Sequence, residues 1–184
     1  LYNETNGEAI LPTPVIGGVG HIPDISQIAG MALPGANQSI VLIGETQGWL
    51  GSSIYLREIC NGEEGAPPKV DLEAERHNGN LVREAIRSGI ITACHDLSDG
   101  GLLVGLAEMA LAGKLGAEIV SVPKMASHAW YFGEDQARYL CITDTPEALL
   151  SKAEAADVAD PGSSPDEAPD AASDATLPMA MAAL

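Results

Sequence analysis

The residues best suited to chemistry lie at positions 90–112, IITACHDLSDGGLLVGLAEMALA, where a buried strand leads through a turn into an apolar helix. Ligands of α/β proteins bind beyond the carboxyl ends of strands, and this turn follows such an end. Gly100 and Gly101 allow a ligand to approach the backbone, and the free amides at the start of the helix attract an anion such as phosphate. The passage therefore predicts a phosphate site at the start of this helix.

The polar side chains of the same turn suggest further chemistry. Asp96 and Asp99 could hold Mg²⁺, a hard cation that takes carboxylate and phosphate oxygens together. His95 is a candidate for proton transfer or for a structural hydrogen bond, and Cys94 beside it would point to the opposite face of the strand. A structural alternative stays open, in which Ser98 or Asp99 caps the helix and the glycines only make a turn.

Two further loops carry candidate binding residues. Glu134, Asp135 and Gln136 precede a predicted strand, and their carboxylates and amide could coordinate a metal or bind a polar ligand. The alternative is that these adjacent acids are only solvated. Residues 44–53, GETQGWLGSS, form a Gly-rich turn between a buried strand and a helix, but they match neither a Gly-Lys-Ser/Thr loop nor GxGxxG.

Alternating strands and helices must position these loops. The predicted strands cover residues 15–20, 39–43, 90–94, 117–120 and 138–143, and the predicted helices cover residues 24–28, 52–60, 72–87, 101–112 and 146–156. Asp71 is the expected N-cap of the longest helix, whose buried face would carry Leu72, Leu81, Ala85 and Ile86. Helical connections between strands favour an α/β (α+β) fold, a mixed β-sheet with packed helices, and periodicity does not decide whether the helices cover one or both faces of the sheet.

Composition restricts the partners and the compartment. Nine basic residues against 26 acidic ones give a net charge of −17, which argues against binding to nucleic acid or to an anionic membrane. No apolar run is long enough to span a bilayer, and the first residues do not form a signal peptide. The cysteines, Cys60, Cys94 and Cys141, are far apart, which indicates reduced core thiols in a cytoplasmic protein.

The chain divides into a domain at residues 1–157 and a tail at residues 158–184. The tail is rich in Ala, Asp, Pro and Ser and has no aromatic residue, so it cannot bury enough apolar surface to offset its ordering entropy. We therefore expect the tail to be disordered. Because the chain opens on Leu1 with what reads as the end of a structured segment, we also expect a piece of a longer polypeptide.

Three sequence blocks resemble one enzyme family. LYNETNGEAILPTPVIGGVG at residues 1–20, HDLSDGGL at residues 95–102 and FGEDQARYL at residues 132–140 are similar to phosphoribosylformylglycinamidine synthase, the synthetase subunit (PurL) of purine biosynthesis. GETQGWLGSSIYLRE lies between the first two blocks, as in the bacterial stand-alone subunit. HDLSDGG-like strings also occur in aminoimidazole ribonucleotide synthetase and selenophosphate synthetase, whereas the first block is more specific.

The resemblance implies an ATP-dependent amidation, in which formylglycinamide ribonucleotide and glutamine-derived ammonia give the amidine, ADP and phosphate. It implies ATP and Mg²⁺ as cofactors. It also implies three kinds of partner, namely a glutaminase subunit, a small accessory protein and the remaining domains of the parent chain. The family has two similar halves of two α/β domains each, and this chain resembles the last of the four, an AIR synthase-related C-terminal domain.

The resemblance carries over no catalytic residue. The family's catalytic histidines lie in its first half, and a Gly-Asn-x-Ser segment that binds ATP, Mg²⁺ and substrate would lie just before Leu1. By internal pseudo-symmetry the resemblance implies ligand-facing residues in three loops: Gly51, Ser52, His95, Asp96, Ser98, Asp99, Gly100, Gly101, Glu134, Asp135 and Gln136. In this half they would face a structural nucleotide or only support the fold.

The expected activity of the isolated chain follows from the family's functional residues that lie outside it. With the histidines and the Gly-Asn-x-Ser segment outside it, we expect the chain alone to be inactive. Two rival interpretations stay open: a domain of a related ATP-using synthetase, and a non-catalytic binding or scaffolding fragment.

Overall fold

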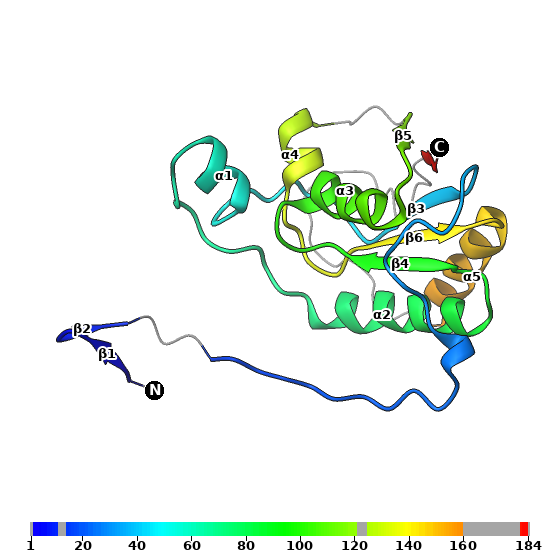
Figure 1. Ribbon diagram of the computed structural model, residues 1–184, viewed down its shortest axis with the longest axis horizontal. Helices are drawn as coiled ribbons and strands as arrows, with labels where there is room; N and C mark the ends of the chain where they lie inside the picture. The colour runs from blue at the N-terminus through cyan, green and yellow to red at the C-terminus, as the bar shows by residue number, and fades with distance from the viewer. Residues whose placement is uncertain (1, 11–13, 121–124, 160–180, 184) are drawn as a thin grey trace.

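The computed structural model describes residues 2–10, 14–120, 125–159 and 181–183, in which an extended N-terminal arm leads into a body built on one sheet (Figure 1). The strands are β1 (Glu4–Thr5), β2 (Glu8–Ala9), β3 (Ser39–Ile43), β4 (Ala93–Asp96), β5 (Ala117–Ile119), β6 (Tyr139–Thr143) and β7 (Met181–Ala183). The body's five-stranded sheet has the order β4-β6-β3-β7-β5, and β1 and β2 form a hairpin in the arm.

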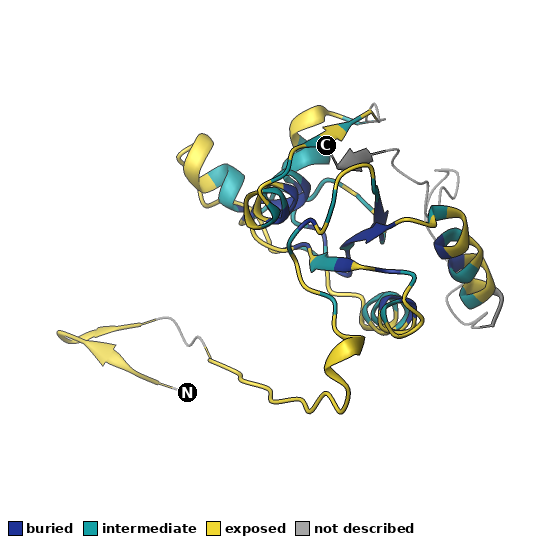
Figure 2. Ribbon diagram, turned by 45° about the vertical axis from the view of Figure 1, so that its right-hand side comes forward, coloured by how far each residue is buried: buried dark blue, intermediate teal, exposed yellow. Residues whose placement is uncertain are grey.

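Helices cover both faces of the sheet, as Figure 2 shows by the buried strands between them. They are α1 (Ile54–Ile59), α2 (Leu72–Arg87), α3 (Gly101–Gly113), α4 (Ser127–Phe132) and α5 (Pro146–Ala159), with a 3-10 turn η1 (Ile25–Gln27). α3 packs on one face, and α2 and α5 pack on the other. The predicted class, helices packed on a β-sheet, is confirmed. In the described ranges the strand pairs are antiparallel, and the parallel element is an isolated bridge between Gly30 and Ala93.

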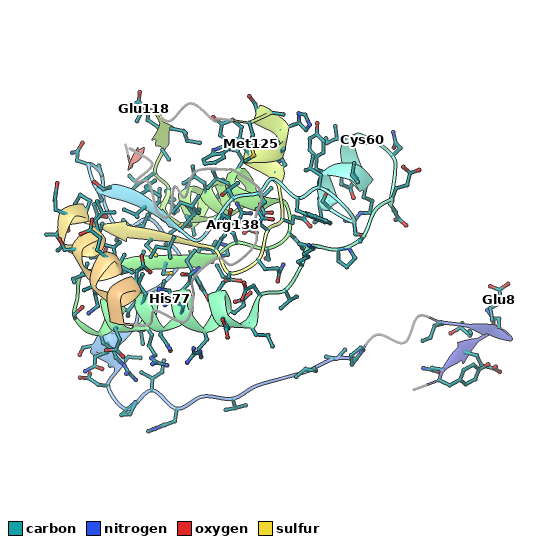
Figure 3. All side chains as sticks on the ribbon, turned by 180° about the vertical axis from the view of Figure 1, so that it is seen from behind. Glu8, Cys60, His77, Glu118, Met125 and Arg138 are labelled. Atoms are coloured by element: carbon teal, nitrogen blue, oxygen red, sulfur yellow. The ribbon has the colours of Figure 1, made fainter. Side chains whose placement is uncertain are left out.

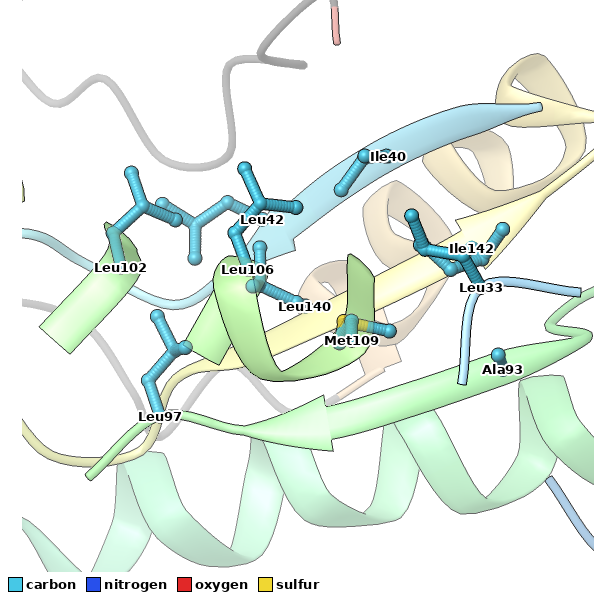
Figure 4. Close-up of a cluster of buried hydrophobic side chains, with 10 residues drawn as sticks. All are labelled: Leu33, Ile40, Leu42, Ala93, Leu97, Leu102, Leu106, Met109, Leu140 and Ile142. Atoms are coloured by element: carbon cyan, nitrogen blue, oxygen red, sulfur yellow. The ribbon is translucent and has the colours of Figure 1, made fainter. Parts of the chain in front are cut away.

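The alternation of side chains along β3 explains why both faces are covered. Ile40 and Leu42 face α3, whereas Val41 and Ile43 face α2 and α5. Because successive strand residues point to opposite faces, an unbroken apolar run must be buried twice. Figure 4 shows the first of the two clusters, in which three side chains of α3 pack on the sheet; its members are Leu33, Ile40, Leu42, Ala93, Leu97, Leu102, Leu106, Met109, Leu140 and Ile142.

The starts of the two long helices differ in how they are capped. The Asp71 carboxylate accepts the backbone N–H groups of Glu73 and Ala74 at 2.9 and 3.0 Å, as predicted. The N-cap of α3 is instead Gly100, which has φ +77° and no side chain to cap the helix. In the structural alternative, the cap by Ser98 or Asp99 is therefore wrong, whereas the two successive glycines with positive φ do turn the chain into the helix.

The antiparallel pairing brings three loops together where β3 and β4 end and β6 begins. β3 and β4 both pair with β6, and so they run in the same direction. Tyr139 at the start of β6 lies opposite both Ile43 and Asp96, the last residues of β3 and β4. The loops that follow β3 and β4, and the loop that precedes β6, therefore meet.

The N-terminal arm departs from the expected strand at residues 15–20. This segment is extended but unpaired, and Val15 and Ile16 are 98% and 88% exposed. A strand needs a partner edge for its backbone groups, and the described residues offer none here. The arm instead holds the β1–β2 hairpin, which the sequence pattern did not indicate.

Other differences are smaller. The strand expected at residues 90–94 begins three residues later, at Ala93, and Leu72 is 76% exposed rather than buried. Cys60 is also exposed, at the C-cap of α1, so it is not a core thiol. α4 and β7 were not predicted. α5 continues past the predicted boundary at residue 157 to Ala159, and residues 181–183 of the predicted tail form β7 in the sheet. Residues 160–180 and 184 lie outside the described residues, so the disorder expected there stays a prediction.

Candidate functional site

The three loops with candidate binding residues form one junction, which we define as residues 44–53, 97–101 and 133–138. The Glu134 N–H donates to the Trp49 carbonyl at 2.8 Å, and the Leu97 N–H donates to the Arg138 carbonyl at 2.9 Å. The junction therefore brings together the segments on which the predicted site residues lie.

Asp135 is held at the centre of the junction by backbone amides. Its carboxylate accepts the N–H groups of Gln47, Gly48 and Trp49 at 3.2, 2.9 and 3.1 Å. Successive N–H groups that converge in this way make a concave anion site, and here the protein's own carboxylate fills it. Asp135 is only 7% exposed, so its two oxygens serve the fold rather than a solvent-borne metal ion.

Glu134 joins the starts of two helices. Its Oε1 atom accepts the N–H of Ile54, the first residue of α1, and the N–H of Gly100, both at 2.8 Å. A carboxylate at helix N-termini also interacts favourably with the helix dipoles. The Gly100 amide is thus occupied from within the protein, and the Gly101 amide donates to the Ser98 carbonyl at 3.1 Å. These two amides are not free for a phosphate.

Arg138 is a buried cation that the sequence analysis missed as a functional residue. It is 1% exposed and lies inside the body, in contrast to Cys60 at its periphery (Figure 3). Its guanidinium donates to the Gly133 and Asp135 carbonyls at 2.6 and 3.2 Å and to the Thr46 hydroxyl at 3.1 Å. The Asp135 carboxylate is 3.8 Å away. Burial lowers the pKa of Arg138, and the Asp135 charge opposes that shift.

Two close backbone approaches explain why glycine is needed in the junction. Gly101 has φ +66°, and a Cβ placed on it would collide with the Gly133 carbonyl. A Cβ on Gly133 would come within 2.8 Å of the Gly48 Cα atom. The three loops therefore touch through their main chains, which leaves no room for side chains between them.

The remaining residues of the β4–α3 turn are open to solvent. Asp96, Ser98 and Asp99 are all exposed. His95 is engaged through both ring nitrogens: Nε2 lies 2.9 Å from a Glu108 carboxylate oxygen, and Nδ1 lies 3.5 Å from Asp96. This geometry favours the structural role for His95 over proton transfer.

Gly51 and Ser52 hold a neighbouring loop. The Ser52 N–H donates to the Glu64 carbonyl at 3.0 Å, and its hydroxyl donates to the Gly65 carbonyl at 2.7 Å. A Cβ on Gly51 would collide with the Ala66 carbonyl. Both residues thus fix the loop between α1 and α2.

A cleft of about 630 Å³ opens beside the junction. Its walls come from the loop after β3, the start of α2 and the segment before β6. Gln136 lines it together with Trp49 and Lys69, and Asn78 on α2 closes one side by donating to the Ala137 carbonyl at 2.9 Å. The residues of the β4–α3 turn do not line this cleft, so the predicted positions divide between two surfaces.

The described residues show neither a cluster of metal ligands nor a helix that could span a membrane. The described ranges contain no group of three or more His, Cys, Asp or Glu side chains positioned to hold a metal ion. None of the helices in the described part of the chain has the length and apolar character needed to cross a bilayer.

The family model for the AIR synthase related protein, C-terminal domain, matches residues 35–164. The chain belongs to this family. It is similar to the PurL subunit of phosphoribosylformylglycinamidine synthase from Nitrobacter hamburgensis, with 59% identity over 152 residues, which are 82% of this chain and 20% of that protein. The Rhodopseudomonas palustris (strain BisB18) subunit is 59% identical over 150 residues, which are 81% of this chain and 20% of the relative.

Solved structures agree on the fold. Thermotoga maritima PurL complexed with ATP matches 72% of this chain and 22% of its own, with 20% identity and a TM-score of 0.56. The same protein complexed with FGAR matches 72% of this chain and 24% of its own, with 21% identity and a TM-score of 0.58. This chain therefore spans about a fifth of the length of the relatives it matches.

Proposed function

We propose that this chain is the C-terminal domain of a phosphoribosylformylglycinamidine synthase synthetase subunit, an ATP-dependent C–N ligase. The parent protein would convert formylglycinamide ribonucleotide, ammonia and ATP into the amidine, ADP and phosphate. The observation that carries the proposal is the 59% identity with the Nitrobacter hamburgensis subunit over 152 residues. The T. maritima relative binds ATP and FGAR in its solved complexes, which supports the same ligands for the parent protein.

The proposal assigns the remaining domains of the parent chain as the first partner. The arm carries apolar side chains that the body does not cover: Val15, Ile16, Val19, Ile22, Ile25 and Ile28 are each at least 50% exposed. Contiguous exposed apolar surface marks a protein contact. An arm of this kind would pack on a neighbouring domain of the same polypeptide.

Further partners and the compartment follow from the same assignment. A glutaminase subunit would deliver the ammonia, and a small accessory protein would join the two; a PurLQS complex is solved for T. maritima. The three free cysteines support a reducing, cytoplasmic location.

Within the domain, we assign the exposed Asp96, Ser98 and Asp99 to a surface that faces a nucleotide and Mg²⁺. Mg²⁺ is bound through one or two carboxylates together with phosphate oxygens and waters, so two exposed acids fit it. When bound, the ion would neutralise phosphate charge. Glu134 and Asp135 do not fit as ligands, because backbone amides already occupy their oxygens.

A chimera tests this proposal directly. This chain would replace the matching segment of the Nitrobacter hamburgensis subunit, and ADP release would be measured with formylglycinamide ribonucleotide, ammonia, Mg²⁺ and ATP. We expect substrate-dependent ADP release from the chimera and none above background from the isolated chain, because phosphoryl transfer needs every group held in place. The same chimera carrying Asp135→Ala is the control for a domain that cannot hold its loops.

Two outcomes would contradict the assignment, and a third would contradict the expected inactivity of the isolated chain. A folded chimera without activity would favour the scaffolding interpretation, which the internal use of Glu134 and Asp135 already makes the best rival. Activity only with the substrates of the related synthetases would favour that branch of the superfamily. ADP release by the isolated chain would mean that a complete active site lies within it.

A further inference from the structure

Two cysteines lie directly opposite each other on β4, the first strand in the order of the sheet, and its neighbour β6. Cys94 on β4 pairs with Cys141 on β6, and their Sγ atoms are 3.8 Å apart. Both are free thiols. Neither takes part in the junction, so the proposed function leaves this pair without a role.

The backbone places the pair at a position where a disulfide can form. The Cys94 N–H donates to the Gly30 carbonyl at 2.9 Å, on the side of β4 away from β6, whereas the Leu97 N–H donates to the Arg138 carbonyl. Hydrogen-bonded and non-hydrogen-bonded pairs alternate along an antiparallel ladder, so Cys94 and Cys141 form a non-hydrogen-bonded pair. Cα atoms of such pairs are about 4.5 Å apart, which lies within the range that a disulfide spans.

We propose that Cys94 and Cys141 are a site of reversible oxidation, at which hydrogen peroxide converts the two thiols into a cross-strand disulfide. The Cys94 thiolate attacks one peroxide oxygen; an S–O bond forms, the O–O bond breaks, and hydroxide leaves and is protonated to water. Cys141 sulfur then attacks Cys94 sulfur; the S–S bond forms, the S–O bond breaks, and a second water leaves. Two thiols are oxidised by two electrons and one peroxide is reduced to two waters.

The environments of the two thiols assign these roles. Cys94 is half-buried, whereas Cys141 has no exposed surface, so peroxide reaches Cys94 first. The hydrogen bond from Cys141 lowers the pKa of Cys94, and the same contact followed by burial raises the pKa of Cys141. Cys94 is the attacking group and Cys141 the resolving one.

The disulfide would act on the two strands that lead into the junction. β4 continues into residues 97–101, and residues 133–138 lead into β6. A covalent bond between these strands would fix the separation of the two loops.

Peroxide treatment followed by mass spectrometry tests the proposal. The chain would carry Cys60→Ser, because Cys60 is exposed and could link two copies. We expect a loss of two hydrogen atoms, and after tryptic digestion without reduction a linked pair of peptides, residues 88–114 and 139–152, that dithiothreitol separates. A Cys60→Ser, Cys94→Ala variant should show neither change.

A second variant keeps the test decisive. In Cys60→Ser, Cys141→Ala, the Cys94 sulfenic acid has no resolving thiol, and dimedone should label it several-fold more than in the Cys60→Ser chain. If that variant fails to fold, the peptide map alone decides. Sulfinic or sulfonic acid on Cys94 with Cys141 still free, or two unmodified thiols after peroxide, would overturn the proposal.

Discussion

The two acidic pairs of the site, Glu134–Asp135 and Asp96–Asp99, are both candidate ligands by residue type, but their environments differ. The Asp135 side chain is 9% exposed and accepts three backbone N–H groups, whereas the Asp96 side chain is 72% exposed. Backbone amides and ligands compete for the same carboxylate oxygens. An acid that a loop's own N–H groups surround belongs to the fold, and an acid that no amide reaches stays available to a ligand.

Among substitutions of these acids, Asp135→Ala should have the largest effect on the free energy of unfolding. The change leaves three amides without an acceptor and removes the carboxylate nearest the buried Arg138, and breaking a buried pair costs about 3–5 kcal/mol. Urea unfolding of the chain should show a loss of that size. The matched variant Asp96→Ala should change the unfolding free energy by less than about 0.5 kcal/mol. Equal losses for the two acids would mean that Asp135 is not the buried anchor.

Next comes Gly101→Ala, which tests the close approach between two loops of the junction. The positive φ costs an alanine about 1–2 kcal/mol, and the collision with the Gly133 carbonyl adds about 1–3 kcal/mol. Gly89 also has positive φ, at +72°, but nothing lies within 4 Å of an added Cβ. Gly89→Ala should therefore lose only the first of these amounts. Thermal unfolding of both variants gives the difference, and the absence of any difference would contradict the contact.

A smaller loss is expected for Glu134→Ala. It removes the charged acceptor shared by the Ile54 and Gly100 amides. One hydrogen bond to a charged group contributes about 1.5–3 kcal/mol, and because Glu134 is only partly buried, water replaces part of what the two amides lose. Glu134→Gln keeps an oxygen at the same place and should recover at least half of the loss in urea unfolding. If both variants unfolded like the unchanged protein, Glu134 would belong with the solvent-exposed acids.

The smallest effect on stability is expected for Asp99→Ala, and here the ligand provides the readout. Asp99 is exposed and gives α3 no cap, so the unfolding free energy should change by less than about 0.5 kcal/mol. If Asp99 faces the nucleotide, MgATP should bind the chimera about tenfold more weakly, which equals about 1.4 kcal/mol in titration calorimetry. Unchanged binding with unchanged stability would remove Asp99 from the proposed surface.

Local pattern was enough to predict most of the elements. Ser39–Ile43 is a strand because five consecutive residues, mostly β-branched, precede Gly44, and α2 begins where Asp71 can cap it. Residues 15–20 have a similar strand-like composition but stay unpaired. A strand exists only with a partner, and composition does not show whether a partner edge is available.

The position of the site was predictable, but the roles of its residues were not. Three loops with unusual polar residues next to buried strands do converge. Which carboxylate is free depends on where the amides of residues 47–49 point, and that depends on backbone angles such as the φ of +76° at Gly48. Arg138 is the first residue of a predicted strand, and its place three residues after Asp135 is the sequence signal of an internal ion pair.

The pairing of β3 with β6 has a consequence for the speed of folding. Val41 and Cys141 lie opposite each other although 100 positions separate them along the chain, and among the described strands β4 joins the sheet through β6. Closing such a long loop has an entropic cost before any contact forms, so domains dominated by non-local pairs fold slowly, on the order of milliseconds to seconds. During synthesis, β3 and β4 cannot pair with β6 until residues 139–143 have emerged from the ribosome. Until then the apolar faces of β3 and β4 stay exposed, and chaperones can bind them.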